Sequence, residues 1–321
     1  MRLICLITVI LATSSPAFAQ SDLNLLLFPE RNYSKTIMRS EISQHEKVND
    51  EEQSEEVEMK ESRFALRYNL KHTEARDLYF TTDAYWVSTH TDATFKESGA
   101  EVPGDLYDTS IGMLYRAELD NGWTFGGSGR IGSSSDKLFN SSDETYFRSL
   151  AFLRVPHLEY TSWVFMASVN TDGDFPIYPG LAYAFPISRT AYAMIGIPII
   201  AAGGQITEKL GVSAMFLPYN SNVRFDYALN DRVTPYAGFI SQSRYFSRAD
   251  REEDDDRLRL SDSRIFAGTT IGVFEHGTID LRAGYVFDRE FGEGDDRDER
   301  NDNSVEIDDA AFFIAGFEIK L

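Results

Sequence analysis

The sequence contains one cysteine, Cys5, which lies inside an apolar stretch at the N-terminus. A chain with a single thiol forms no internal disulfide and no cysteine-rich metal site. After that stretch no run of 18 consecutive apolar residues follows, although a membrane-spanning helix needs about that length. Basic residues are also few, since 31 Lys and Arg stand against 51 Asp and Glu, for a net charge of −20. Nucleic acid is therefore not an expected partner, because phosphate binding requires a basic surface.

The N-terminus has the pattern of an export signal. Arg2 precedes the apolar residues 3–12, and Ala17-Phe18-Ala19 follows as a small-x-small cleavage site. The apolar core is too short to span a bilayer, so we expect residues 1–19 to be a signal peptide, removed together with Cys5. Residues 20–61 have no sustained period and include the acidic run 51–58, which predicts an acidic flexible periplasmic segment.

From about residue 62 onward, apolar and polar residues alternate with a period of two, and a helical period is absent. The alternating stretches are about 10–15 residues long, enough to cross a bilayer at a tilt, whereas the average strand has about five or six residues. Strands of that length favour a membrane barrel over a soluble β-sandwich, which alternates in the same way. The clearest stretches are 107–119, 123–131, 163–169, 223–229, 265–273 and 279–287.

The connections between these stretches fall into two classes. Short ones lie at 120–122, 188–190, 230–231 and 275–277, and long polar ones at 92–106, 133–144, 247–262 and 289–303. Short turns at one rim and long loops at the other are typical of outer-membrane barrels. We therefore expect residues 62–321 to form an all-β, transmembrane up-and-down antiparallel β-barrel in an outer membrane, in contact with its lipid.

The strand number is harder to derive, because the alternation of short and long connections slips between residues 181 and 229. This segment contains Pro186, Pro198 and Pro218. Either the run 191–206 kinks into two strands at Pro198, or residues 62–71 lie outside the barrel. Bacterial single-chain barrels have an even number of strands, so we expect 12 or 14.

The last strand carries the most specific motif. Phe313, Ala315, Phe317, Ile319 and Leu321 form one apolar row, and Gly316 stands five residues before the end. This pattern resembles the C-terminal signal that outer-membrane proteins present to the barrel assembly machinery. The resemblance implies that Gly316, Phe317, Ile319 and Leu321 are recognised by that machinery as a partner. Leu321 departs from the usual terminal Phe, and Ile314 occupies a position that is usually polar.

A second resemblance covers residues 175–240. The string Phe175-Pro176-Ile177-Tyr178-Pro179-Gly180-Leu181-Ala182-Tyr183, then Gly196-Ile197-Pro198 and Phe225-Asp226-Tyr227-Ala228-Leu229, is similar to a family of outer-membrane barrels of unknown function. This likeness implies the fold and the location, and it implies no activity and no functional residues.

Motifs of enzymes and cofactor sites are missing. The five histidines show no HxxxH or HExxH spacing, and there is no GxSxG elbow and no phosphate-binding loop. We therefore expect no catalytic residues, no cofactor and no metal centre. A rim hydrolase built from His90 with Asp83 or Asp92 is the alternative. The acidic runs 250–256 and 295–302 lack the glycine of a calcium-binding EF-hand loop at the sixth position, which leaves loose binding of divalent cations.

The polar row opposite the apolar row should face the interior of the barrel. A barrel of 12–14 strands is too wide to be packed shut by side chains alone, since eight strands already just fill. A water-filled path and a lattice of ion pairs both fit this row, in which eight arginines outnumber three acids and would favour anions. We expect a passive, porin-like channel for small polar solutes; the alternative is a non-transporting surface barrel, adhesin or structural, that acts through its long loops. The candidate lumen-lining residues are Arg116, Glu118, Arg130, Arg148, Arg154, Arg224, Asp226, Arg244, Arg264, Asp280 and Arg282.

Overall fold

The computed structural model describes residues 37–47, 58–73, 75–172, 176–218, 220–251, 256–295 and 297–320. The predicted signal peptide, most of the predicted periplasmic segment, Phe175 and Leu321 lie outside these residues. Within them, no helix is long and apolar enough to cross a membrane.

The described chain is folded into one antiparallel sheet with two short helical turns. Its first strands are β1 (Ile37–Lys47), β2 (Glu58–Thr73), β3 (Arg76–His90), β4 (Asp105–Glu118), β5 (Thr124–Ser135), β6 (Thr145–Pro156), β7 (Ser162–Asn170) and β8 (Ile177–Pro186). The others are β9 (Ala191–Ile197), β10 (Ile200–Gln205), β11 (Leu210–Leu217), β12 (Asn220–Tyr227), β13 (Val233–Phe246), β14 (Arg257–Phe274), β15 (Gly277–Gly294), β16 (Ser304–Ile307) and β17 (Ala310–Lys320). The helical turns are η1 (Ser142–Glu144) and α2 (Arg297–Asp302).

The sheet closes on itself. From β1 to β15 each strand pairs with the next, β15 pairs with β17, and β17 pairs with β1 from Ile37↔Lys320 to Lys47↔Ala310. The short strand β16 precedes β17 along the same edge of β15 and pairs with β15 alone. The barrel wall therefore has 16 strands, β1–β15 and β17. This confirms the all-β, antiparallel closed barrel, whereas the expected number of 12 or 14 strands is wrong.

Two features explain the higher count. Strands β9 to β12 have only 7, 6, 8 and 8 residues, so they are shorter than the stretches on which the estimate relied. Pro198 lies between β9 and β10, as the kink interpretation requires, because proline cannot donate to the ladder and ends both strands. In addition, β1 lies in the segment expected to be flexible, and β2 starts at Glu58. The barrel therefore begins before residue 62, earlier than the period-two pattern indicates.

The connections follow the predicted asymmetry. At one end of the barrel the strands are joined by short turns such as 119–123 and 275–276, and the longest connections, such as 91–104 and 247–256, lie at the other. At Asp120-Asn121-Gly122, Gly122 has a φ of +78°, which glycine adopts without strain, and the Asn121 side chain accepts a hydrogen bond from the Trp123 N–H. We call these the short-turn end and the long-loop end, which in outer-membrane barrels face the periplasm and the exterior respectively.

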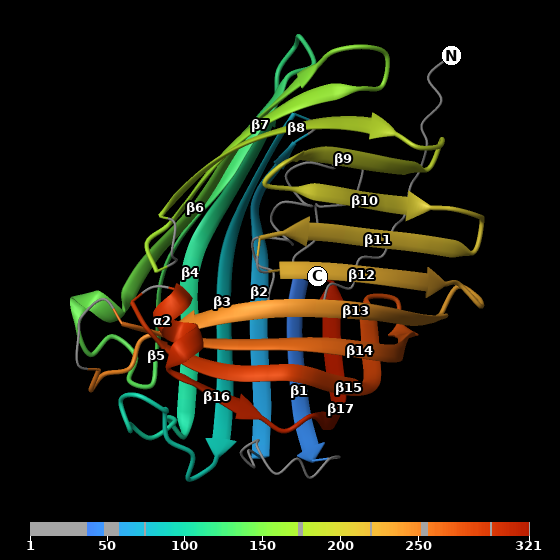
Figure 1. Cartoon of the computed structure of the whole chain (residues 1–321). Helices are drawn as coiled ribbons and strands as arrows, with labels where there is room; N and C mark the ends of the chain where they lie inside the picture. The colour runs from blue at the N-terminus through green and yellow to red at the C-terminus, as the bar shows by residue number, and fades with distance from the viewer. Residues whose placement is uncertain are drawn as a thin grey trace.

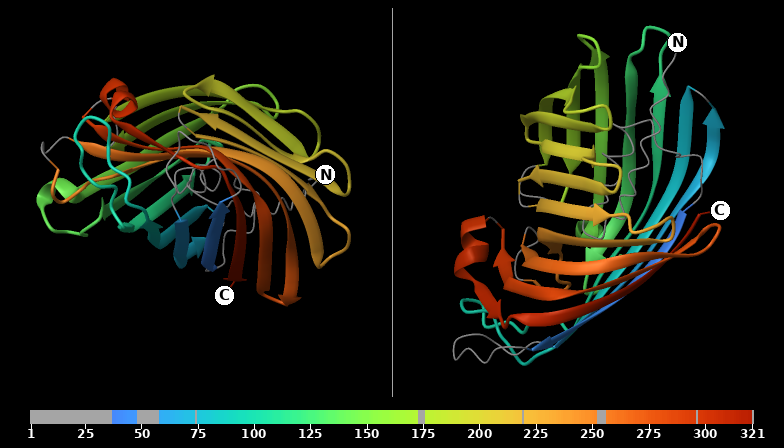
Figure 2. Two further views of the ribbon diagram at one scale, coloured as in Figure 1. Left: turned by 60° about the horizontal axis from the view of Figure 1, so that its bottom comes forward. Right: turned by 90° about the vertical axis from the view of Figure 1, so that its right-hand side faces the viewer.

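The wall consists of two regions whose strands run in different directions. In Figure 1, strands β13, β14 and β15 lie crosswise in front of β2, β3 and β4, and β9 to β12 run in a similar direction above them and to the right. Figure 2 shows the same two regions from two further sides. Each strand is rotated relative to its neighbour by the twist of the sheet. Two distant parts of one closed wall can therefore face each other with their strands running at an angle.

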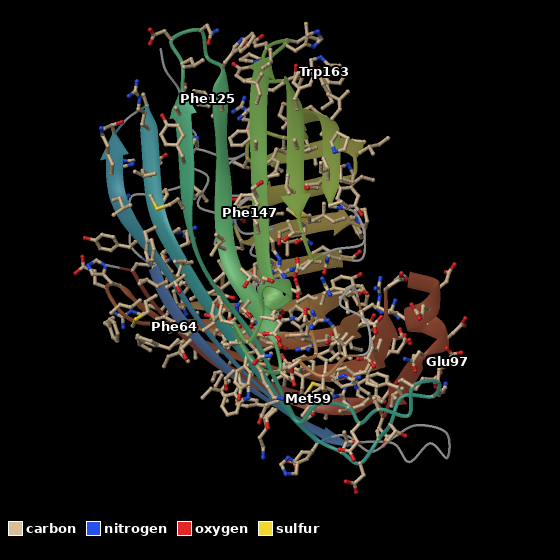
Figure 3. All side chains as sticks on the ribbon, turned by 90° about the vertical axis from the view of Figure 1, so that its left-hand side faces the viewer. Met59, Phe64, Glu97, Phe125, Phe147 and Trp163 are labelled. Carbon is tan, nitrogen blue, oxygen red and sulfur yellow. The ribbon has the colours of Figure 1, made fainter. Side chains whose placement is uncertain are left out.

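The outer face is apolar. On the alternating strands the apolar row points away from the interior, and its large members are among the most exposed side chains of the protein. Figure 3 shows this surface with Phe64, Phe125, Phe147 and Trp163, of which Phe125 and Trp163 lie toward the end opposite to Met59 and Glu97. Exposed members of the row are Phe64, Ile111, Met113, Phe125, Ile131, Phe147, Phe165, Leu181, Ile195, Phe225, Ile265, Leu281 and Phe313.

Candidate functional site: the interior of the barrel

Most of the residues expected to line the lumen are on the inner face, where they are buried or half-buried. Arg116, Arg130, Arg224, Arg264, Asp280 and Arg282 are buried, whereas Arg148, Arg154, Asp226 and Arg244 are half-buried. Glu118, at the end of β4, is exposed. The structure does not gather these residues along one path but divides them among separate clusters.

The first cluster surrounds Arg264 on β14. Its guanidinium lies 2.7 Å from Oε1 of Glu61 on β2 and 2.7 Å from Oδ2 of Asp262 on its own strand. The side-chain amide of Gln242 on β13 donates a hydrogen bond of 3.0 Å to the same Asp262 oxygen. The Arg264 charge is therefore balanced by two carboxylates inside the barrel.

The second cluster surrounds Tyr236 on β13. Its hydroxyl donates to Asp280 at 2.7 Å and accepts a 3.2 Å hydrogen bond from Nε of Arg282. Arg224 lies over the Tyr236 ring at 3.6 Å and donates from Nε to Asp226 at 2.7 Å. Four of the predicted residues, two arginines and two aspartates, thus meet around one tyrosine that the sequence interpretation did not include.

Other predicted residues have partners of their own. Toward the short-turn end, Arg116 is 3.0 Å from Asp77, which also contacts Nδ1 of His72 at 2.6 Å. Arg154 donates to the Ser162 hydroxyl at 2.9 Å. Each contact joins neighbouring strands and braces the wall locally.

Two further arginines contact aromatic rings. The Arg244 guanidinium lies over the Tyr85 ring at 3.6 Å, and the Arg148 guanidinium lies over the Tyr146 ring at 3.8 Å. Arg148 is also 3.3 Å from Asp108 and bonded to Asp172. A guanidinium stacked on an aromatic ring is held more firmly than one in an aqueous channel.

The inner face contains acids that the sequence interpretation missed. Glu61 was missed because it precedes residue 62, and Asp262 because it was placed in a long loop. Their true strands are β2 and β14, and the alternation of those strands, extended to their real ends, would have found both. Buried arginines were missed as well, among them Arg259 and Arg289, so the predicted count of eight arginines against three acids no longer describes the interior. The buried acids outside the predicted set are Glu41, Glu61, Asp77, Asp83, Glu144, Asp262, Glu293 and Asp308.

An apolar cluster, here called the mouth cluster, fills the interior at the long-loop end. It includes Phe95 from the connection between β3 and β4, Phe246 from β13 and Phe291 from β15, all at most 1% exposed. Asn303 fixes the connection, because its side-chain oxygen accepts a 3.0 Å hydrogen bond from the Glu97 N–H. The full cluster is Met59, Tyr85, Val87, Ala93, Phe95, Val102, Leu106, Phe246, Leu258, Leu260, Phe291, Val305 and Ile307.

A second apolar cluster, here called the short-turn cluster, joins the two crossing regions nearer the short-turn end. Tyr79 on β3 and Phe152 on β6 pack with Met194 on β9 and Met215 on β11. These strands are far apart in the ring, so their side chains meet across the interior. In the described part of the chain, inward-pointing Tyr, Phe and Met side chains from different strands therefore contact one another inside the barrel.

The two walls are also joined through the backbone. The Ser247 N–H after β13 donates to the Ser134 carbonyl on β5 at 2.7 Å, and the Ala249 N–H donates to Asp136 at 2.7 Å. Ser135 and Ser247 form a parallel bridge. The ends of β5 and β13, which are distant along the wall, therefore pair directly.

Of the candidate hydrolase residues, Asp83 and His90 do not come together. On β3, Asp83 is buried on the inner face and His90 is exposed on the outer face. Seven residues separate them, about 23 Å along an extended strand. No group of three or more His, Asp or Glu side chains among the described residues could hold a metal ion. Parts of the acidic runs 250–256 and 295–302 lie outside those residues.

The C-terminal strand has the predicted polarity. Phe313 is exposed on the outer face, while Phe312 and Ile314 are buried inside. Gly316 faces inward between β1 and β15, and a Cβ atom there would lie 3.2 Å from Cγ of Glu41. The glycine therefore has a local packing reason at this position.

Neither a family model nor a curated protein sequence matches the chain. Among solved structures the fold is similar to an outer membrane channel from Pseudomonas putida F1, at 10% identity over 90% of this chain and 96% of that one, with a TM-score of 0.41. It is similar to the translocator domain of the autotransporter NalP from Neisseria meningitidis, at 10% identity over 94% and 92% of the chains, with a TM-score of 0.35. A mutant of the TodX monoaromatic hydrocarbon channel matches at 9% identity over 89% of each chain, with a TM-score of 0.38.

The location follows from the architecture itself. A closed sheet leaves no unpaired edge, and here it carries an apolar outer face and a polar, ion-paired inner face. Only closed barrels and helices satisfy all backbone groups inside lipid. The chain is an outer-membrane β-barrel, as the sequence predicts.

Proposed function

We propose that this protein is an outer-membrane barrel that is closed in its resting state and acts at the cell surface through its long loops. The observation that carries the proposal is the contact across the interior between strands that are not neighbours, such as the Arg264–Glu61 ion pair between β14 and β2. A solute crossing the barrel would have to separate this pair and to displace the mouth cluster as well.

The long-loop end supports the same proposal. The connection between β3 and β4 folds inward and is held by Asn303, and α2 packs against β15. A connection that folds inward narrows the mouth of a barrel. In the described part of the loops, α2 carries the exposed acids Asp298, Glu299 and Asp302.

Conductance of the purified protein in planar lipid bilayers tests the proposal. We expect no steady conductance from the unmodified barrel. Replacing residues 95–100 by a Gly/Ser linker removes Phe95 from the mouth cluster and should produce conductance. The matched control replaces residues 137–142, in the connection between β5 and β6, by the same linker and should leave the barrel closed. Steady current through the unmodified protein would refute a closed resting state.

Two kinds of surface action can be separated in cells. An adhesin requires its loops for attachment, so the 137–142 replacement should reduce attachment to surfaces while the outer membrane remains intact. A structural barrel requires its presence in the membrane, so deletion of the whole gene should sensitise cells to detergent and the loop replacement should not. If neither attachment nor detergent resistance changes, action through the loops is wrong.

A passive channel for small polar solutes is the second candidate function. The strand number favours it, because barrels of 16–18 strands commonly enclose an aqueous channel. In this case the wall contacts would be gates. The same bilayer measurement decides, since a channel must conduct without any engineered opening of the mouth.

We also propose that the barrel is not an enzyme, supported by the opposite orientation of Asp83 and His90 on β3. Turnover of a phospholipid, ester or peptide by the folded barrel, abolished by His90→Ala, would contradict this. The proposed partners are outer-membrane lipid on the apolar face, the barrel assembly machinery at β17, and loosely bound divalent cations at the acidic loops.

A further inference from the structure

The long-loop ends of β9 to β12 form a low part of the barrel wall, here called the low rim (residues 195–200 and 216–218). These four strands have 7, 6, 8 and 8 residues, whereas β14 and β15 have 18 each. A transmembrane strand needs about 9–11 residues at a tilt of about 45°. At about 3.4 Å per residue and that tilt, the four strands cover about 14–19 Å across the membrane, less than the apolar band of about 25 Å on outer-membrane barrels. Figure 1 shows them side by side, next to the longer β13.

The connections at the low rim are uncharged. β9 is joined to β10 by residues 198–199, which are Pro-Ile, and β11 to β12 by residues 218–219, which are Pro-Tyr. Every other connection between neighbouring wall strands at the long-loop end contains Asp or Glu. A charged loop is stable in water, whereas an uncharged one can enter hydrocarbon without the cost of burying a charge.

Large apolar side chains gather at the low rim on the outer face. Ile197 is 78% exposed, the highest value for a large apolar side chain among the described residues. Ile195 on β9, Ile200 on β10 and Phe216 on β11 are also exposed, and the strand register places these three side by side. Contiguous exposed apolar side chains mark a surface that contacts lipid or protein.

The backbone of the low rim also suits lipid. Pro198 and Pro218 have no N–H group, so these tips present fewer unpaired donors, which hydrocarbon cannot satisfy. The Ile199 side chain points inward and belongs to the short-turn cluster together with Leu114 of β4. Leu114 follows Met113, which is exposed in the lipid-facing row. The tip between β9 and β10 therefore lies level with the lipid-facing row of the taller wall.

We propose that acyl chains of the outer leaflet cover the low rim, so that the membrane is thinner beside β9 to β12 than around the rest of the barrel. A wall whose hydrophobic height is too small is accommodated by local thinning of the bilayer. The low rim continues the lipid-facing row without a break, since Leu181 of that row pairs with Ile197. This inference goes beyond the proposed surface role, because the long acidic loops belong to other parts of the rim.

Fluorescent labels on single cysteines test the contact with lipid. Cys5 is the only natural cysteine and lies in the predicted signal peptide, so the mature barrel offers a cysteine-free background. Ile197→Cys places the label on the low rim. Ile131→Cys, exposed on the outer face of β5, is the lipid control, and Ser142→Cys, exposed in the connection between β5 and β6, is the water control. Each labelled barrel is reconstituted in phosphatidylcholine vesicles and quenched by brominated acyl chains or by aqueous iodide.

The label at position 197 should behave like the one at position 131. We expect brominated lipid to remove as much of its fluorescence as at position 131, and iodide to remove far less than at position 142. Quenching by iodide as strong as at position 142 would overturn the proposal, because the rim would then lie in water. Protection from both quenchers, with a disulfide formed between two unlabelled Ile197→Cys barrels, would show that a second copy covers the rim and would also overturn it.

Bilayer thickness tests the local thinning. Ile197→Asp and Ser142→Asp are folded into vesicles of dilauroyl- or dioleoyl-phosphatidylcholine, and the folded yield is read from gel mobility without heating. In the thin dilauroyl bilayer the low rim reaches the surface, so the two variants should fold equally well. In the thicker dioleoyl bilayer the aspartate at position 197 meets acyl chains, and the yield of Ile197→Asp should fall severalfold below that of Ser142→Asp. An equal ratio in both lipids would overturn the proposal. Neither readout depends on conductance or attachment, so the low rim can fail while the proposed function stands.

Discussion

The guanidinium of Arg264 on β14 lies 2.7 Å from the Glu61 carboxylate on β2, although β15, β17 and β1 separate these strands along the wall. The ion pair therefore crosses the interior. Both side chains are almost fully buried, at 4% and 7% exposure. Removing one charge of such a pair leaves the other buried without its partner, which is more costly than losing an exposed pair.

Glu61→Leu should lower the free energy of unfolding by about 3 kcal/mol, because Arg264 then keeps only Asp262 as a counter-charge. Replacing both residues by leucine should recover part of this loss. Lys60→Ala is the matched control on the same strand, since its ion pair with Glu58 is exposed and contributes about 0–1 kcal/mol. Urea unfolding followed by gel mobility measures all three variants. Equal stability of Glu61→Leu and the control would mean that the walls are not held together by this pair.

Asn303→Ala should loosen the connection between β3 and β4. The side chain accepts hydrogen bonds from the Glu97 and Ser98 N–H groups and donates one to the Glu293 carbonyl at 3.2 Å. We expect faster cleavage by an added protease within residues 91–104 on intact cells. Asn230→Ala, in a turn at the short-turn end, serves as the control and should leave this cleavage unchanged. Unchanged cleavage in Asn303→Ala would show that the mouth cluster alone fixes the connection.

Period-two alternation and the two loop classes were enough to predict the closed antiparallel barrel and the apolar outer face, because both depend on local sequence. The strand number failed at β9 to β12, where strands of 6–8 residues are too short for the pattern to register. The kink at Pro198 was anticipated as one of two alternatives.

The interior was harder to predict. Alternation places Arg264 and Arg282 on the inner face, but it says nothing about which distant strand faces them. The contact of Arg264 with Glu61 depends on the crossing of two wall regions, a property of the whole sheet. Likewise, the sequence does not indicate that Tyr85 on β3 and Gln242 on β13 lie around one space inside the barrel, because their strands are distant in the chain.

The mature protein should fractionate with the outer membrane. A closed barrel resists detergent at room temperature, so the unheated sample should migrate faster on gels than the boiled one. Recovery in the soluble periplasmic fraction, with a single mobility at both temperatures, would contradict the membrane assignment.

Ile265→Lys should disturb the outer face. This side chain is 51% exposed in the middle of β14, where a lysine facing lipid costs about 2–4 kcal/mol near the membrane midplane. Ile206→Lys is the matched control, since Ile206 is similarly exposed at 56% but lies in the turn between β10 and β11, at the short-turn end. The yield of heat-modifiable protein in the outer membrane measures the difference. Equal yields would indicate that the middle of β14 does not face lipid.

The C-terminal strand allows packing and recognition to be separated. Gly316→Val places atoms against Glu41 on β1, where even a Cβ atom lies 3.2 Å from Cγ, so the closure between β1 and β17 should weaken. Ala315→Val, on the exposed outer face, should be tolerated. Leu321→Asp places a charge in the predicted assembly motif, where we expect it to impair recognition by the assembly machinery or to add the cost of a charge near lipid. We expect Gly316→Val to insert but unfold at lower urea, and Leu321→Asp to accumulate as uninserted chain, far more than the same change at Val57 in the acidic run. Equal insertion of Leu321→Asp and Val57→Asp would show that the last residue is not part of the assembly signal.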